Sequence, residues 1–81
     1  MPRFYFHFED HGVRVRDEVG LPLPDAEAAW YQAVRSACDL IRSEGTIGYS
    51  LIDRSVAIED ERGLPVNRIP LEEIANFVIR A

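Results

Sequence analysis

Apolar and polar residues alternate strictly at the start of the chain. Every second residue between positions 3 and 9 is a phenylalanine, and the residues between carry polar groups: Phe4, Phe6 and Phe8 against Tyr5, His7 and Glu9. A period of two with many aromatics predicts a half-buried strand. Residues 13–16 alternate in the same way, and the intervening Asp10-His11-Gly12 supplies a turn. The two segments are therefore expected to form a hairpin.

One register of this hairpin keeps its apolar side chains on one face. With a two-residue loop at positions 11 and 12, Phe8 faces Val15, and Glu9 faces Arg14. A shift by one residue would set Phe8 against Arg14 and divide the apolar residues between both faces. The predicted apolar face comprises Phe4, Phe6, Phe8, Val13 and Val15. The predicted polar face comprises Tyr5, His7, Glu9, Arg14 and Arg16.

A pattern of three- and four-residue steps extends over residues 25–44 and predicts one long helix. Its apolar stripe consists of Ala26, Ala29, Trp30, Ala33, Val34, Ala37, Leu40 and Ile41. We expect the alanines to bring the helix close to the phenylalanine face of the sheet. Trp30, Leu40 and Ile41 are expected to supply most of the buried area. Asp25 suits the N-cap position, and Gly45 suits the C-cap.

A second hairpin is predicted after the helix. Residues 55–60 read as a strand, and Glu61-Arg62-Gly63 reads as a turn. A three-residue loop there pairs Ile58 with Val66, and Pro65 places the last strand at an edge of the sheet. Pro70 then suits the first position of a short C-terminal helix.

These elements predict one α+β domain, residues 1–81, in the order strand, strand, helix, strand, strand, short helix. If the second hairpin lies beside the first strand, the four-stranded sheet is antiparallel with strand order 2-1-3-4. The long helix then packs on one face of that sheet. A chain of 81 residues buries a modest core, and oligomerisation is one common remedy for that.

The charge balance is acidic, with 14 acidic side chains against 9 basic ones, all of them arginine, and a formal charge of −5. Such a chain repels phosphate backbones, which disfavours nucleic acid as a partner. No apolar run reaches the ~18–20 residues of a membrane span. Cys38 is the only cysteine, so no intrachain disulfide forms, and we expect its thiol to be buried in the helix. The first residues lack a signal-peptide pattern, so a cytoplasmic protein is expected.

Candidate chemistry is sparse in this sequence. His7 and His11 lie on one hairpin without the spacing of a zinc motif, and the chain has no glycine-rich phosphate loop. A Cys38–His7 nucleophile pair would require the thiol to leave the apolar stripe. The acid pairs Asp17-Glu18 and Asp60-Glu61 are expected to be solvated turn charges. We predict no catalytic, cofactor-binding or metal-binding residue, and no enzymatic activity.

The best candidate surface is the outer face of the predicted sheet, formed by Tyr5, His7, Glu9, Arg14 and Arg16. One interpretation is a solvated face held by cross-strand pairs such as Glu9–Arg14. The other is a protein interface, because tyrosine and arginine are enriched at interfaces. A homodimer, or another protein partner, would fit the second interpretation.

Three stretches carry a resemblance to a known family. They are Met1-Pro2-Arg3-Phe4-Tyr5-Phe6-His7, then Arg16-Asp17-Glu18 with Gly20, then Leu23-Pro24-Asp25 followed by Ala28-Ala29. In these stretches the chain resembles a family of small bacterial proteins catalogued only as a domain of unknown function. Asp60, Gly63 and Ile69-Pro70-Leu71 fit the family more loosely. The resemblance implies a compact bacterial cytosolic protein and assigns no activity or functional residue.

The leading functional hypothesis is a non-enzymatic interaction module that self-associates through the outer sheet face. The alternative is a regulatory nucleic-acid-associated protein such as an antitoxin, because small strand–strand–helix–strand antitoxins share this layout. An enzyme using His7 has the least support of the three.

Overall fold

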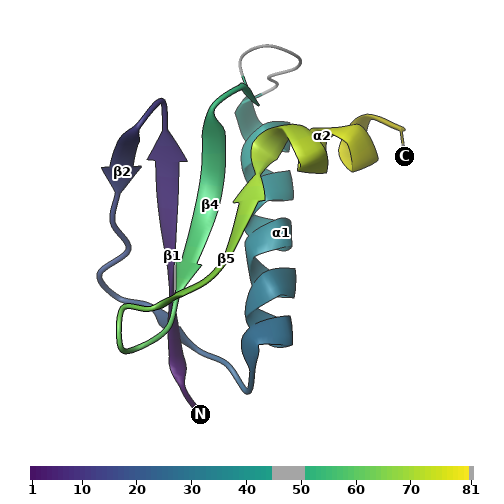
Figure 1. Cartoon of the computed structure of the whole chain (residues 1–81). Coiled ribbons are helices and arrows are strands. Elements are labelled where there is room, and N and C mark those ends of the chain that lie inside the picture. Colours follow the sequence, from purple (N-terminus) through teal and green to yellow (C-terminus); the bar gives the residue numbers. More distant parts are fainter. Residues whose placement is uncertain (45–50, 81) are drawn as a thin grey trace.

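The computed structural model describes residues 1–44 and 51–80 and has the predicted α+β class (Figure 1). The elements follow in the order β1 (Arg3–Asp10), β2 (Val13–Val15), β3 (Leu21–Pro22), α1 (Ala26–Glu44), β4 (Arg54–Glu59), β5 (Pro65–Pro70) and α2 (Leu71–Arg80). The antiparallel sheet, the long helix and the short C-terminal helix are all present as predicted.

The sheet has β1 and β4 at its centre. Its four longer strands follow the order β2-β1-β4-β5, the arrangement predicted for the two hairpins. The two-residue strand β3 is an addition that the sequence pattern does not predict, and it pairs with Arg3 and Phe4 at the start of β1. Because β2 pairs only with residues 8–10 of β1, the same edge of β1 has no strand partner at residues 5–7 within the described part of the chain.

The first hairpin has the predicted register, with Phe8 opposite Val15 and Glu9 opposite Arg14. In the second hairpin the predicted pairing of Ile58 with Val66 is wrong. Ile58 lies opposite Asn67, because a β-bulge inserts one extra residue into β5 after Pro65. The bulge still lets Val66 pack against the core. As predicted, Pro65 lies in an edge strand.

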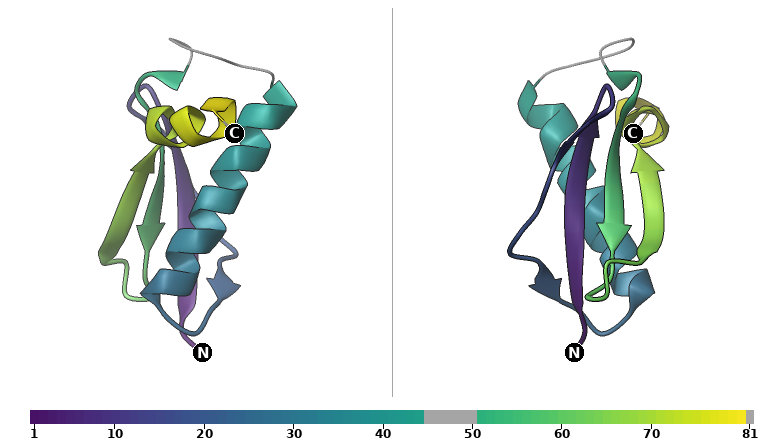
Figure 2. Two further views of the ribbon diagram at one scale, coloured as in Figure 1. Left: turned by 90° about the vertical axis from the view of Figure 1, so that its right-hand side faces the viewer. Right: turned by 60° about the vertical axis from the view of Figure 1, so that its left-hand side comes forward.

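Helix α1 packs along the inner face of the sheet (Figure 2). It begins after the predicted N-cap, where Oδ1 of Asp25 accepts the N–H of Ala28 at 2.8 Å. Ala29, Ala33 and Ala37 are fully buried and join Phe4 in the core. The absence of larger side chains at these three positions brings the helix close to the strands, as predicted. The expected C-cap, Gly45, lies outside the described residues. Within residues 1–44 and 51–80, no helix is long and apolar enough to cross a membrane.

The predicted role of Trp30 in the core is wrong. Its side chain is 39% exposed, whereas Ile41 is buried and Leu40 packs against the core. Trp30 points about 60° around the helix from Ala33, so it borders α2 instead of facing the strands. Cys38, expected to be buried, is half-buried on the same side of the helix.

Helix α1 does not cover β2. Val13 and Val15, predicted to share the apolar face with the phenylalanines, are therefore exposed. The core instead lies over β1, β4 and β5, and α2 closes one end of it through Leu71 and Ile74. On the opposite, outer face of the sheet, no helix of residues 1–44 and 51–80 lies above the strands (Figure 2), and the predicted surface residues lie there.

Candidate interaction surface

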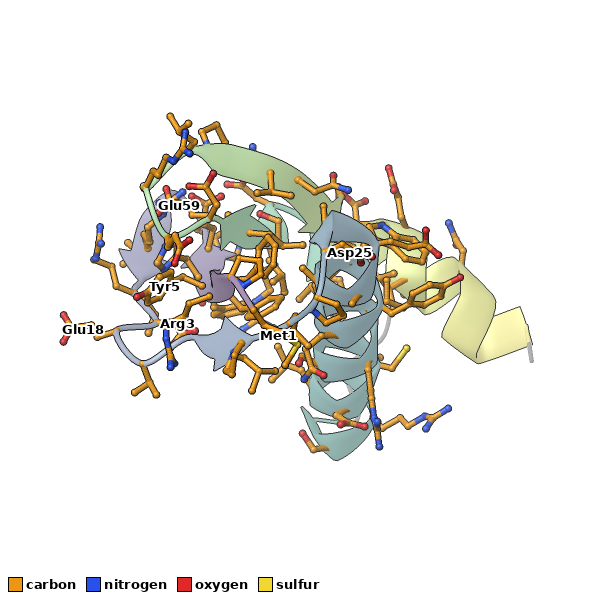
Figure 3. All side chains as sticks on the ribbon, turned by 90° about the horizontal axis from the view of Figure 1, so that it is seen from below. Met1, Arg3, Tyr5, Glu18, Asp25 and Glu59 are labelled. Atoms are coloured by element: carbon orange, nitrogen blue, oxygen red, sulfur yellow. The ribbon has the colours of Figure 1, made fainter. Side chains whose placement is uncertain are left out.

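The outer face of the sheet carries four of the five predicted surface residues on its strands. Tyr5, His7 and Glu9 project from β1, and Arg14 projects from β2. Viewed along the sheet, Tyr5 and Glu59 lie on the side away from α1 (Figure 3). Arg16 follows the end of β2 and lies beside Tyr5 and His7 at the rim of a hollow. The predicted residues therefore lie together on the outer side of the sheet.

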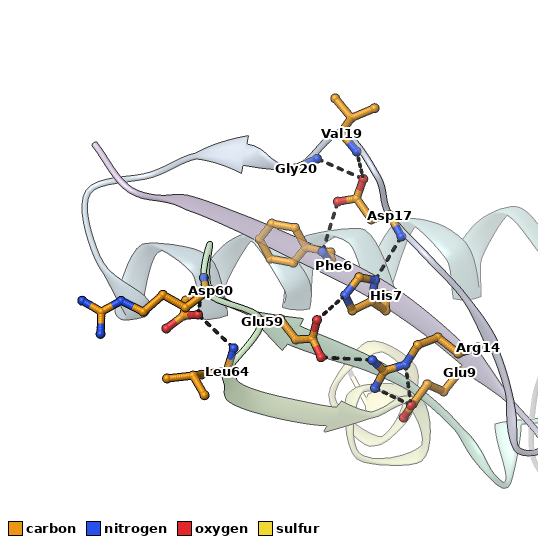
Figure 4. Close-up of polar contacts among 11 residues, drawn as sticks. Phe6, His7, Glu9, Arg14, Asp17, Val19, Gly20, Glu59, Asp60 and Leu64 are labelled. Atoms are coloured by element: carbon orange, nitrogen blue, oxygen red, sulfur yellow. Dashed lines mark hydrogen bonds and ion pairs between the residues drawn. The ribbon is translucent and has the colours of Figure 1, made fainter.

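Arg14 connects three strands across this face. Its Nε and Nη2 donate to Oε2 of Glu9 at 3.0 and 2.8 Å, and its Nη1 donates to Oε2 of Glu59 at 3.1 Å. The hydrogen bond from Arg14 lowers the pKa of Glu9, and the bonds to Glu9 and Glu59 raise the pKa of Arg14. The predicted Glu9–Arg14 pair is thus present, and Glu59 extends it onto β4 (Figure 4).

His7 is not an exposed member of this face, contrary to its predicted place among the outward-facing polar residues. Its side chain is 1% exposed. Its Nδ1 accepts the backbone N–H of Asp17 at 3.0 Å, and its Nε2 lies 2.8 Å from Oε1 of Glu59. A backbone N–H can only donate, so Nδ1 carries no proton and the ring proton is on Nε2, which donates to Glu59. The ring is therefore neutral and of one tautomer.

The segment after β2 covers His7 because Asp17 fastens it to β1. Its Oδ2 accepts the N–H of Phe6 at 3.1 Å, at the part of the β1 edge that has no strand partner. Its Oδ1 accepts the N–H groups of Val19 and Gly20, both at 3.1 Å. Burial alone would raise the pKa of Asp17, but these backbone donors outweigh burial and lower it. Asp17, expected to be a solvated turn charge, is thus a half-buried structural anchor.

Gly20 completes this anchor. Its φ is +72°, and a Cβ at this position would lie 2.8 Å from Cγ of Arg3 and 2.9 Å from Cε1 of Tyr5. Only glycine combines the left-handed backbone with such a close approach. Arg3 in turn donates from Nη1 to the carbonyl oxygen of Val19 at 2.9 Å. The anchored segment therefore lies directly against the base of β1.

The other half of the outer face is covered by Arg68 of β5. Its Nε donates to Oγ of Ser55 at 3.0 Å and lies 3.4 Å from Oε1 of Glu9. Ser55 also donates to Oε1 of Glu9 at 3.3 Å. Beneath these polar contacts, Ser55 and Ala57 of β4 are buried. The face is therefore a hydrogen-bonded polar layer over small buried residues.

Two shallow hollows indent this layer, and Glu59 lines both. The first, of about 310 Å³, includes Tyr5, His7 and Arg16 in its lining. The second, of about 390 Å³, lies over Ala57 and includes Arg14 and Arg68.

The match to a known protein family includes all the residues that form this surface. The family model described as "Domain of unknown function (DUF6894)" matches residues 3–72. The chain belongs to the DUF6894 family. No curated protein and no solved structure gives a significant match. The matched residues of the DUF6894 domain include β1 to β5, both hollows and the first residues of α2.

Four residues of the outer face in this DUF6894 domain are not among the surface residues predicted from the sequence: Asp17, Ser55, Glu59 and Arg68. Alternation along β4 places Ser55 and Glu59 on one face. Which face that is depends on the pairing of β4 with β1, which the local pattern does not determine. No local sequence pattern indicates the role of Asp17, because that role depends on the unpaired part of the β1 edge. Within the part of the DUF6894 domain that the structure describes, no three His, Cys, Asp or Glu side chains form a group able to hold a metal ion.

Proposed function

We propose that the protein is a small, non-enzymatic interaction module that self-associates through the outer face of its sheet. The observation that carries this proposal is the pair of adjacent hollows that Glu59 lines, in a face where Glu9, Arg14, Glu59 and Arg68 are already paired with one another. Tyrosine and arginine are enriched in interfaces: Tyr5 and Arg16 line the first hollow, and Arg14 and Arg68 line the second. In keeping with a single cysteine and no intrachain disulfide, we propose a cytoplasmic location.

The paired charges favour binding in two ways. Arg14 is held by two carboxylates before any partner arrives, so less side-chain entropy is lost on association. Its charge also keeps hydrogen-bond partners after water is displaced, which reduces the cost of burial. Arg16, in contrast, is exposed at the rim of the first hollow and is positioned to donate to a second molecule.

The contacts of His7 support a structural role over a catalytic one. Both ring nitrogens are engaged within the chain, by the Asp17 N–H and by Glu59. A general base needs a nitrogen that reaches the substrate proton. The buried ring instead fixes the floor of the first hollow.

Nucleic-acid association, as in an antitoxin, is the alternative function. No contact in the described residues favours it over self-association. Arg14 and Arg68 of the outer face are paired with carboxylates, and the formal charge of the chain is −5. Phosphate binding would require these arginines to exchange their partners. A mobility-shift assay over a range of salt concentrations tests this alternative directly.

The test of the proposal is the molar mass in solution, measured by light scattering and sedimentation from micromolar to millimolar concentration. We expect the mass to rise with concentration, and Arg16→Glu or Tyr5→Ala to reduce that rise. Ser36→Glu is the control, because it adds a carboxylate at an exposed position of α1, away from the outer face. A wild-type chain that stays monomeric throughout, or variants that leave the mass unchanged, would overturn the proposal.

A further inference from the structure

An apolar groove lies on the other side of the molecule, between α1 and α2. It is lined by Trp30, Tyr31, Val34, Cys38 and Ile74 and encloses about 300 Å³. Trp30 and Tyr31 remain 39% and 61% exposed. Their rings meet edge to face, with centroids 5.1 Å apart. Two large aromatic side chains are thus held in a fixed arrangement at the surface of the helical layer.

The groove follows from the spacing of residues along α1. The buried alanines face the sheet, whereas Tyr31, Val34 and Cys38 recur at steps of three and four on a neighbouring side of the helix. Such spacing is typical of a seam between two helices. Helix α2 contributes Ile74 to this seam and crosses near the C-terminal end of α1 (Figure 1). Tyr31 remains exposed along the seam.

The charges at the two ends of α1 determine which helix fits the groove. Glu27 lies in the first turn, seven residues before Val34, and Arg42 lies in the last turn, eight residues after it. Both are exposed, and neither has a charged partner among the described residues. A second α1 that crosses antiparallel near Val34 would bring its Arg42 towards Glu27, and the two-fold symmetry would repeat this pair. A parallel arrangement would instead set like charges together.

We infer that this groove and the exposed side of α1 bind α1 of a second copy of the chain, antiparallel and about a two-fold axis near Val34. Trp30 and Tyr31 of each copy enter the groove region of the other, and Glu27 pairs with Arg42 at both ends. A stable interface covers about 800 Å² on each partner, more than a groove of five residues offers. The contact therefore extends along α1, and this requirement favours helix-along-helix packing over the insertion of one side chain.

This contact goes beyond the self-association proposed for the outer sheet face. The helix and the outer face lie on opposite sides of the sheet, so each contact leaves the other accessible. A chain with both contacts would assemble beyond a dimer, and a chain with one of them would stop at a dimer. The two proposals can therefore fail separately.

The test reverses the terminal charges in the Arg16→Glu background, where the outer-face contact is removed. Each of Glu27→Arg and Arg42→Glu would place like charges together twice in a homodimer. We expect each variant to raise the dimer dissociation constant at least tenfold by sedimentation equilibrium. An equimolar mixture of the two variants would form a heterodimer with both pairs restored, and it should bind within about threefold of the unreversed chain.

The control is Ser36→Arg, which changes a charge two residues from Val34, about 200° around the helix and away from the groove. It should leave the dissociation constant unchanged. The fluorescence of Trp30, the single tryptophan, should shift to shorter wavelength on dimerisation as its ring leaves water. Both reversed positions are exposed, so circular dichroism of the variants should match that of the parent.

Two results would overturn the inference. One is a chain that stays monomeric to millimolar concentration in the Arg16→Glu background. The inference also fails if such a monomeric chain shows a shift in Trp30 fluorescence only when an unrelated amphipathic peptide is added. The other is a dimer that the single reversals do not weaken or that mixing them does not restore. If Arg16→Glu alone leaves the wild-type mass unchanged while the reversals reduce it, the outer-face proposal fails and the helix contact stands.

Discussion

The backbone N–H of Asp17 donates to Nδ1 of His7 at 3.0 Å, and this one bond determines the protonation state of a buried ring. The ring must offer a lone pair to that donor, so its proton lies on Nε2 and points at Glu59. The same bond holds the chain after β2 against the sheet. A local backbone contact thus fixes both the chemistry of His7 and the shape of the first hollow.

Replacing His7 by phenylalanine keeps a ring in the buried site and removes both hydrogen bonds. The Asp17 N–H would lose its acceptor, and a buried unsatisfied donor costs about 1–3 kcal/mol. We expect the free energy of unfolding in urea to fall by about that amount, and the Asp17 amide to exchange faster with solvent. His11→Phe is the matched control, since His11 is exposed. Equal stability of His7→Phe and wild type would contradict the hydrogen-bonded arrangement.

The tautomer of His7 is a separate prediction. Because Nδ1 accepts a hydrogen bond, nitrogen NMR at neutral pH should show a neutral imidazole protonated on Nε2. The Nε2 proton should exchange slowly, because the ring is 1% exposed and the proton is donated to Glu59. A spectrum of the Nδ1–H tautomer, or of an imidazolium at neutral pH, would show that the Asp17 contact is absent.

Acid should destabilise the fold through Asp17 and Glu59. The pKa of Glu59 is lowered by its hydrogen bonds to His7 and Arg14, and the pKa of Asp17 is lowered, against burial, by backbone donors. The unfolded chain, with ordinary pKa values, takes up protons first as the pH falls. This stabilisation is therefore complete above about pH 5 and is lost as the pH falls through the folded-state pKa values.

The variant Asp17→Asn tests this acid sensitivity. It should be less stable than wild type at pH 7, and its free energy of unfolding should fall less steeply with acid, because one titrating group is gone. Glu18→Gln provides the control at an exposed neighbouring position. The same slope with pH in Asp17→Asn and wild type would contradict the role of the carboxylate.

Alanine substitutions at Gly20 and Gly63 distinguish two costs of an added methyl group, the backbone strain of a positive φ and a steric clash. Both have positive φ, +72° and +80°, but a Cβ at Gly20 meets Arg3 and Tyr5 within 3 Å, whereas none of the described atoms lies within 4 Å of a Cβ at Gly63. A left-handed residue costs about 1–2 kcal/mol, which is the loss expected for Gly63→Ala. Gly20→Ala adds a steric clash and should lose more, about 2–4 kcal/mol. Equal losses in urea unfolding would show that the segment does not approach β1 as closely as described.

Local pattern was sufficient for most of the fold. The alternation in β1, the apolar stripe of α1 and the cap at Asp25 each depend on near neighbours, so residue order alone predicts them. The register of the first hairpin follows as well, because only one alignment keeps Phe8 and Val15 on the same face. The strand order of the two hairpins is predicted only on the condition that the second hairpin lies beside the first strand, which it does.

The wrong predictions share a physical cause. Each concerns a feature that depends on elements distant in sequence. Trp30 is 39% exposed because it borders α2 instead of facing the strands, and a bulge in β5 shifts the pairing of Ile58 from Val66 to Asn67. His7 is buried by the segment after β2, which lies over it only because Asp17 finds an open edge of β1. Periodicity identifies the face of the sheet but does not determine what covers it.

The two edges of the sheet limit how copies of this chain can meet. One edge is divided between β2, of three residues, and β3, of two, with the Asp17 carboxylate occupying the gap. The other edge, β5, begins at Pro65 and ends at Pro70, which have no N–H to donate. Neither edge offers a long row of free backbone groups to a new strand, so growth by strand addition is blocked. In the self-association that we propose, contacts between copies would then depend on side chains, and single surface substitutions would be able to abolish them.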